Sequence, residues 1–400
     1  MEHATVAPPW AQAAEHAIAA GQWHGAWCAL LDAALPAALA AQQAVLARLD
    51  AWDALPAQAA AAQRASLLRA TLTALDAAHA ASAGHGAHAH APNAANVPTG
   101  QAWRVQGTQL VKRYRSGSFT LGPVEVDVAP GHILGLVGEN GNGKTTLLRL
   151  LAADLAPDAG QLDWGTPAHD PYALRARLAY IPQRPHPWGG RLMDHLQFAA
   201  RSHGVAGEAN RCLVELVIAR LSLRAFRGHA WKQLSSGYKM RFELARALLT
   251  QPRVLLLDEP LANLDINAQQ TLLTDLQSLA RSPWRPMALV LSSQQLYEVE
   301  KVADAVLFLD RGQPRSVQER FAQMGGCAVE FETTWPVATL AAWLGQLPAH
   351  THQVNGQTHI VSFHGATSAA DFLRAAVDAG MPLGYFRDIT GSTRRLFVKD

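Results

Sequence analysis

The 400-residue sequence predicts an α/β core, preceded by a helical region and followed by a smaller α+β domain. Three observations lead to this fold class. The apolar stretch 133–137 runs into a glycine-rich loop and then into the leucine-rich stretch 146–152, which is the strand–loop–helix order of a parallel α/β unit. A second apolar stretch, 254–257, ends in acidic residues, as parallel strands do at a ligand crevice. Residues 1–80 instead show alanine-rich helical spacing.

Composition narrows the function classes. The chain has 34 Lys and Arg against 32 Asp and Glu, a formal net charge of +2, so nothing electrostatic favours nucleic acid or acidic lipid as a partner. Three cysteines stand far apart and in no metal-binding spacing: Cys28, Cys212 and Cys327. We therefore expect a reducing, cytoplasmic setting without structural disulfides.

The sequence contains no signal for export or insertion. Its first residues carry no basic stretch followed by an apolar run, so we expect no signal peptide. No segment has 18 uninterrupted apolar residues; the nearest, 29–41, contains Asp32 and Pro36. We expect that the chain does not span a membrane by itself.

Residues 1–80 predict a small bundle of three or four Ala-rich helices. Pro36 and Pro56 are expected to end or kink helices. The alternative is a set of loosely packed helices that only a partner orders. Residues 81–102 predict a flexible linker, in which His85, His88 and His90 are better explained as part of the tract than as a metal site.

Residues 103–322 predict the α/β core. Strand-like stretches at 109–114 and 124–128 precede the loop and predict an antiparallel β subdomain. Residues 325–400 predict a β-α-β-β-α-β accessory domain of the ferredoxin-like type, with a hairpin turn at Asn355-Gly356. Its expected elements are strands at 328–334, 359–363, 383–389 and 396–398, and helices at 337–347 and 368–379.

The loop Gly138–Thr145 has the form G-x-x-x-x-G-K-[ST], the phosphate-binding P-loop. Glycines let successive backbone N–H groups point at a triphosphate. Lys144 would reach the β- and γ-phosphates, and the Thr145 hydroxyl would bind Mg²⁺. The residues expected to contact ATP here are Gly138, Asn140, Gly141, Gly143, Lys144, Thr145 and Thr146.

Two acidic residues end the strand at 254–257. Asp258 would hold Mg²⁺ at the crevice, and Glu259 would act as the general base that polarises the attacking water. A strand that merely ends in acids is the structural alternative, but the preceding P-loop argues against it.

Upstream lies Leu234-Ser235-Ser236-Gly237-Tyr238, followed by a basic helix. With the P-loop and Asp258-Glu259, this stretch resembles the ABC ATPase family, whose signature is usually Leu-Ser-Gly-Gly-Gln. Ser236 replaces a glycine and Tyr238 the glutamine, variants similar to those of exporter ATPases. The resemblance covers roughly residues 104–322. It implies that Ser235 and Gly237 cap the γ-phosphate of ATP bound to the opposite subunit.

The resemblance assigns three more positions. Tyr114 would stack on adenine, with a surface strand tyrosine as the alternative. Gln183 would link Mg²⁺ to a helical subdomain of about residues 184–230. Asp265, after Leu264, would lie across the dimer interface in the D-loop.

One position departs from the family. Gln294 stands where a histidine usually contacts the γ-phosphate. A glutamine can donate a hydrogen bond but cannot become cationic, so slow hydrolysis is conceivable although Glu259 and Lys144 remain.

A single copy of each motif implies that half of each active site comes from another chain. The resemblance implies a head-to-tail dimer, homodimeric or with a partner ATPase, around two Mg²⁺-ATP, which drives a separate transmembrane permease subunit of an exporter from the cytoplasmic face of the membrane. We expect no direct contact with nucleic acid. The alternatives are a soluble ABC ATPase that acts on nucleic acid or the ribosome, and a nucleotide-gated binding module with slow hydrolysis that acts through its flanking domains.

Overall fold

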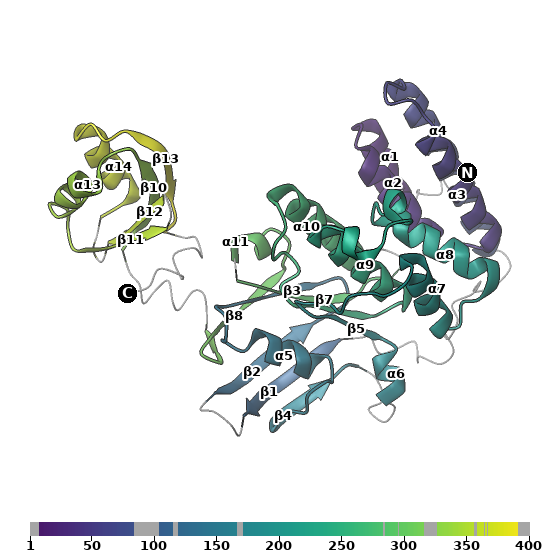
Figure 1. Cartoon of the computed structure of the whole chain (residues 1–400), viewed down its shortest axis with the longest axis horizontal. Coiled ribbons are helices and arrows are strands. Elements are labelled where there is room, and N and C mark those ends of the chain that lie inside the picture. Colours follow the sequence, from purple (N-terminus) through teal and green to yellow (C-terminus); the bar gives the residue numbers. More distant parts are fainter. Residues whose placement is uncertain are drawn as a thin grey trace, which may run out of the picture.

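The computed structural model shows a helical N-terminal unit, a central α/β core and a C-terminal α+β unit (Figure 1). The described residues are 8–83, 104–114, 119–165, 171–282, 285–294, 296–315, 326–355, 358–363, 365 and 367–390. None of the helices in these ranges is both long and apolar enough to cross a membrane.

The centre of the core is a six-stranded sheet. In spatial order its strands are β5 (Leu178–Ile181), β6 (Val254–Leu257), β7 (Ala288–Ser293), β3 (Ile133–Val137), β8 (Ala305–Asp310) and β9 (Gln313–Arg315). The first five are mutually parallel, and β9 pairs antiparallel with β8. The parallel arrangement brings the carboxyl ends of β3, β6 and β7 to one edge of the sheet.

Alternate side chains of the central strands enter two different hydrophobic cores, because successive residues of a strand face opposite sides of the sheet. Leu134 and Leu136 of β3 belong to one core, and Ile133 and Val137 belong to the other. Both faces of these strands are therefore covered, which explains why their sequences are apolar without interruption.

The first face is covered by the antiparallel β subdomain and by α5 (Lys144–Leu151). Its three strands lie in the order β2 (Thr120–Val128), β1 (Val105–Arg113) and β4 (Ala159–Asp163). This confirms the antiparallel strands predicted from residues 109–114 and 124–128.

The second face is covered by helices that share its core. They are α7 (Leu192–Ser202), α8 (Gly207–Arg220), α9 (Ser236–Leu249), α10 (Ile266–Ala280) and α11 (Leu296–Val299). Short elements complete the core: α6 (Pro171–Arg175), η1 (Arg224–Phe226) and η2 (Trp231–Gln233). α5 and α9 thus lie on opposite faces of one sheet.

Four helices form the N-terminal unit: α1 (Pro9–Ala19), α2 (Trp23–Ala34), α3 (Leu39–Asp53) and α4 (Ala61–Ala83). As predicted, α2 ends before Pro36 and α3 before Pro56. α4 continues through Ala83, three residues into the predicted linker 81–102, because Ala and Ser do not interrupt a helix. The three linker histidines lie outside the described residues.

The N-terminal helices pack against the core as well as against one another. Leu216 of α8 is fully buried in the hydrophobic cluster of α1–α4, and Ala219 packs against it. Beneath this contact, Arg220 Nε donates a 2.8 Å hydrogen bond to Asp32 Oδ1, across 188 residues of sequence. The bundle and the ATPase core therefore share an apolar and ionic interface.

The C-terminal unit has the predicted element order β-α-β-β-α-β. It consists of β10 (Ala328–Thr333), α13 (Val337–Leu344), β11 (His350–Asn355), β12 (Thr358–Phe363), α14 (Ala369–Asp378) and β13 (Leu383–Asp388). Its antiparallel sheet has the order β11-β12-β10-β13, with both helices contributing to one core. α13 ends at Leu344, three residues earlier than predicted, with Gly345 as its C-cap. The predicted strand 396–398 lies outside the described residues.

Candidate nucleotide site

The P-loop connects β3 to α5 at the carboxyl edge of the sheet. A Cβ on Gly138 would lie 2.4 Å from the carbonyl oxygen of Leu309, so only glycine fits against β8. Gly143, the N-cap of α5, has a left-handed φ of 97° that favours glycine. The loop is thereby shaped so that it delivers backbone N–H groups and the positive end of α5 to one place.

Asn142 fixes this loop to β8. Its Nδ2 donates to Leu309 O at 3.1 Å, and its Oδ1 accepts from the backbone N–H of Arg311 at 3.1 Å. Asn140 stands exposed at the tip of the loop. The two asparagines therefore differ in role, since one anchors the loop and the other is free to face a ligand.

Lys144 lies inside the curve of the loop and is 4% exposed. Its Nζ donates to the carbonyl oxygens of Gly138 at 2.6 Å and Glu139 at 3.1 Å. It also forms an ion pair with Glu259 Oε1 at 3.3 Å. The predicted phosphate-binding lysine is thus held next to the predicted general base.

Thr145 and Asp258 meet at the start of α5. Thr145 Oγ1 donates a 2.7 Å hydrogen bond to Asp258 Oδ2, and Ser292 Oγ donates to Asp258 Oδ1 at 2.7 Å. A hydroxyl and a carboxylate, both hard oxygen ligands, form the donor set that Mg²⁺ prefers. These residues fit a Mg²⁺ ion that also binds phosphate oxygens.

Tyr180 approaches the same carboxylate oxygen as Thr145, with its hydroxyl 3.5 Å from Asp258 Oδ2. Burial, together with the negative charge of Asp258, raises the pKa of Tyr180 above its usual value. The phenol stays protonated at neutral pH and remains a hydrogen-bond donor toward Asp258.

Glu259 is surrounded by donors. Its Oε2 accepts from Gln183 Nε2 at 2.7 Å and from Gln294 Nε2 at 2.7 Å. Its backbone N–H donates to Ser292 Oγ at 2.8 Å, and its φ of 48° is left-handed. A non-glycine residue in this conformation costs on the order of 1 kcal/mol, and such strain is concentrated at functional sites.

Tyr114 follows the end of β1 and is 38% exposed. Its hydroxyl lies 3.3 Å from Thr146 Oγ1, and its ring centroid lies 6.4 Å from that of Phe119. The predicted adenine-stacking residue is therefore next to the P-loop helix and partly exposed.

The signature residues lie at the start of α9, not in the P-loop cluster. Ser235 is the N-cap of α9, where its Oγ accepts from Tyr238 N at 3.4 Å. Ser236 Oγ donates to Asn263 O at 2.7 Å, and a Cβ on Gly237 would lie 3.5 Å from Leu264. Asp265 caps α10 by accepting from Ala268 N at 2.9 Å. The signature and the D-loop are thus in contact with each other.

Among the described residues, no hydrogen bond or ion pair joins Ser235, Ser236 or Asp265 to residues 138–145. α9 belongs to the core on one face of the sheet, whereas α5 belongs to the core on the other. The structure therefore brings Lys144, Gln183, Glu259 and Gln294 together and keeps the signature apart from them.

Sequence reasoning assigned no role to Ser292, Tyr180 or Asn142. Ser292 was detectable as a polar residue that ends an apolar strand beside the strand of Asp258, since Leu257 pairs with Leu291. Tyr180 and Asn142 gave no comparable signal, because their partners depend on the packing of strands far apart in the sequence.

The fold and the site together define a P-loop ATPase core. The ABC transporter family matches residues 121–262. One relative, an aliphatic sulfonates import ATP-binding protein of Xanthomonas axonopodis pv. citri, is 33% identical over 217 residues, 54% of this chain and 69% of its own length. A daunorubicin resistance ATP-binding protein of Streptomyces coeruleorubidus is 31% identical over 229 residues, 55% of this chain and 70% of its own.

The chain belongs to the ABC transporter family of ATP-binding proteins, a family of ATPases. Among solved structures, cbiO1 from Clostridium perfringens, described as part of the ABC transporter complex cbiONQ, has a similar fold. Its TM-score is 0.50 at 20% identity, over 56% of this chain and 95% of that one. The two relatives and this solved structure match 54–56% of this chain.

Proposed function

We propose that this chain is the ATP-hydrolysing subunit of an ABC-type exporter. It works as a head-to-tail dimer around two Mg²⁺-ATP and drives a separate membrane permease from the cytoplasmic side. The observation that carries the proposal is the hydrogen-bonded cluster of Lys144, Glu259, Gln183 and Gln294 beside Thr145 and Asp258. This cluster contains the groups that phosphoryl transfer to water requires.

In this proposal the residues divide the work as follows. The P-loop amides and Lys144 bind the β- and γ-phosphates, and Thr145 and Asp258 hold Mg²⁺, which would neutralise phosphate charge. A water oxygen attacks the γ-phosphorus, the bond to the β–γ bridging oxygen breaks, and ADP leaves with the electron pair. Glu259 Oε2 accepts the proton of the water. Gln183 and Gln294 orient this carboxylate oxygen by donating hydrogen bonds to it.

The pairing of Lys144 with Glu259 has a consequence for this chemistry. One ammonium is shared between a carboxylate and the loop carbonyls. A phosphate that binds Lys144 competes with Glu259 for the same ammonium, so binding of the triphosphate frees Oε1 of Glu259 from its ion pair. The same contact thus couples phosphate binding to release of the Glu259 carboxylate.

The dimer is supported by the separation of α5 and α9. Because the two helices cover opposite faces of one sheet, Ser235 serves the phosphates of a second chain. The test mixes two variants, Lys144→Ala and Ser235→Arg, each inactive alone. A heterodimer retains one intact composite site, so mixing should restore part of the ATPase activity. If the mixture stays as inactive as its components, the composite site is wrong.

The role of Glu259 is tested by steady-state hydrolysis. Glu259→Gln keeps the volume and should lower turnover by about 10² or more, while ATP binding is retained. The same variant should form a dimer in ATP, seen as doubled mass by light scattering. Unchanged turnover would remove Glu259 from the role of base.

The permease and the direction of transport belong to the proposal as well. Ser236 and Tyr238 resemble the signature of exporters, and one relative is named a resistance protein, although others are named importers. Co-purification of the tagged chain with a membrane protein tests the partner. For direction, host cells carrying Glu259→Gln should accumulate a compound that wild-type cells release. Depletion of that compound inside the cells would indicate import.

A second candidate is a nucleotide-gated binding module with slow hydrolysis, favoured by Gln294 in place of histidine. The two candidates differ in whether a membrane permease stimulates ATP hydrolysis. Turnover that rises when a permease is added in membranes supports the exporter; turnover that stays low and unresponsive supports the module. Co-sedimentation with ribosomes would support the soluble alternative instead.

A further inference from the structure

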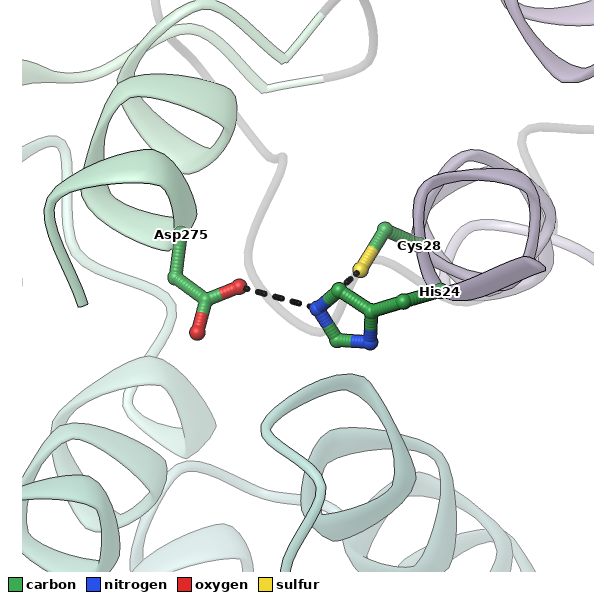
Figure 2. Close-up of side chains that lie close together, drawn as sticks. All are labelled: His24, Cys28 and Asp275. Carbon is green, nitrogen blue, oxygen red and sulfur yellow. Dashed lines mark hydrogen bonds and ion pairs between the residues drawn. The ribbon is translucent and has the colours of Figure 1, made fainter. Parts of the chain in front are cut away.

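Three metal-ligating side chains meet between the N-terminal helices and the ATPase core (Figure 2). His24 and Cys28 are four residues apart and share one face of α2, and Asp275 faces them from α10. Their ligand atoms all lie within 4.8 Å of one another. Cys28 Sγ and Asp275 are buried, whereas the His24 side chain is 51% exposed.

The distances between the ligand atoms suit a tetrahedral ion. His24 Nε2 lies 3.5 Å from Cys28 Sγ and 3.6 Å from Asp275 Oδ1. Zinc bonds of about 2.0 Å to nitrogen and oxygen and about 2.3 Å to sulfur place these atoms about 3.5 Å (N to S) and about 3.3 Å (N to O) apart at tetrahedral angles. The two distances from His24 Nε2 therefore agree within tenths of an ångström with those in a tetrahedral zinc site.

We propose that His24, Cys28 and Asp275 form a binding site for a divalent transition-metal ion, zinc by its ligand set, which ties α2 to α10. A nitrogen, a thiolate sulfur and a carboxylate oxygen are the ligands that zinc accepts, and magnesium and calcium disfavour sulfur. Three protein ligands leave a fourth position for water.

The surroundings of the site orient its ligands. Arg220 Nη1 donates to Cys28 Sγ at 3.1 Å and to Asp275 Oδ1 at 3.3 Å, which fixes the positions of both ligand atoms. The other two nitrogens of that guanidinium, Nε and Nη2, donate to Asp32 Oδ1 and Ser278 Oγ. Arg241 pairs with Asp275 Oδ2 at 3.3 Å. The formal charges of the two arginines and the two aspartates cancel one another.

The site is open to solvent from one side. His24 lines a cavity of about 680 Å³, together with Trp23, Trp27 and Arg64. His24 therefore lies between this cavity and the buried side chains of Cys28 and Asp275, and it is the side of the site from which an ion would enter.

The site connects the N-terminal bundle to a helix of the ATPase core. α2 belongs to the N-terminal bundle, and α10 begins directly after Asp265 of the predicted D-loop. A metal bond across this contact stabilises the docked bundle by the free energy of metal binding to the folded chain. The inference does not depend on the transport function.

The experiment uses the full chain, freed of metal by a chelator and then dialysed against zinc alone. Wild-type protein should retain one zinc per chain and show a raised melting temperature. Cobalt in place of zinc should give the thiolate-to-metal charge-transfer band. His24→Ala and Cys28→Ser should lose the zinc, the band and the zinc-dependent stabilisation.

Cys212→Ser is the matched control, because Cys212 is also buried but lies in α8 outside the group. It should behave as the wild type does. His24→Ala is the variant least able to disturb folding, since that side chain is half exposed. Retention of zinc in both ligand variants, or no zinc in a folded wild type, would overturn the site and leave the contact as an ionic anchor.

Discussion

Gln294 donates a 2.7 Å hydrogen bond to Glu259 Oε2, from the position where the family usually has histidine. Gln183 donates to the same oxygen at the same distance. The side chain at 294 therefore contacts the predicted base directly, and its amide cannot take up a proton.

We expect Gln294→Ala to lower the turnover number by roughly 3- to 30-fold, because one charge-assisted hydrogen bond to the base is lost while Gln183 remains. ATP affinity should change little. Steady-state hydrolysis and binding of a fluorescent ATP analogue measure the two quantities. Gln270→Ala, on the exposed side of α10, is the control. An equal loss in both variants would contradict a specific role for Gln294.

Tyr114→Ala should weaken ATP binding by about 5- to 30-fold, since stacking of a base on an aromatic ring contributes about 1–3 kcal/mol and this ring is partly exposed. Tyr114→Phe keeps the ring and loses only the contact to Thr146, so it should bind nearly as the wild type does. Titration with ATP tests both. Equal weakening by the two substitutions would show that the hydroxyl, and not the ring, binds.

Asp258→Asn should abolish magnesium-dependent hydrolysis while nucleotide still binds. The substitution keeps the shape of the side chain and one of its two acceptor oxygens, which bind Thr145 and Ser292, but removes the negative charge that a hard cation requires. Hydrolysis measured against increasing Mg²⁺ checks this, with chelation of Mg²⁺ from the wild type as the reference. Wild-type turnover at ordinary Mg²⁺ would contradict the role of Asp258 as a ligand.

Asp32→Ala should lower the free energy of unfolding by about 3–5 kcal/mol, because it leaves the buried Arg220 guanidinium partly uncompensated. Asp50→Ala is the control, since Asp50 pairs with Arg224 at the surface and is 67% exposed. Its loss should cost about 1 kcal/mol or less. Chemical denaturation measures both. Similar small effects would show that the N-terminal bundle does not depend on its ionic contact.

The C-terminal unit should lose stability in acid. His352 and His359 share a 3.1 Å hydrogen bond, and burial lowers the pKa of both, with the neighbouring histidine charges adding to the effect at His352. Because the unfolded chain, with pKa values of about 6.5, binds more protons, stability is complete above that pH and falls as the pH drops below it.

Hydrogen exchange of β10–β13 in the full chain, corrected for intrinsic rates, measures this loss. His352→Gln should reduce the pH dependence. His132 is an exposed histidine of the ATPase domain, and His132→Gln should leave the pH dependence unchanged. Exchange that does not accelerate in acid would contradict the role of the histidine pair.

Features of this chain that depend on local sequence patterns were predictable, and features that depend on contacts between distant residues were not. β3, α5 and β6 were predicted because an uninterrupted apolar strand and a glycine loop are local patterns. The order of the C-terminal elements was predicted as well, and in the structure Ser368 caps α14. Element ends were less certain, as α4 and α13 show.

Long-range contacts left almost no trace in the sequence. Asp32 was visible only as an acid within an apolar helix, and its partner Arg220 lies 188 residues away. The meeting of Cys28 with Asp275 was equally hidden, because it depends on how α2 docks on α10. The resemblance to a family could not supply these contacts, since it began near residue 104.

The burial of Leu216 inside the N-terminal cluster means that the ATPase core depends on the N-terminal helices for its packing. Removing residues 8–83 would expose the apolar side of α8 to water and strip Arg220 of one of its carboxylates. A shortened chain would then expose an apolar and charged surface on α8, which favours aggregation. The amino-terminal helices must accompany the core whenever it is expressed, transplanted into another transporter or reassembled from fragments.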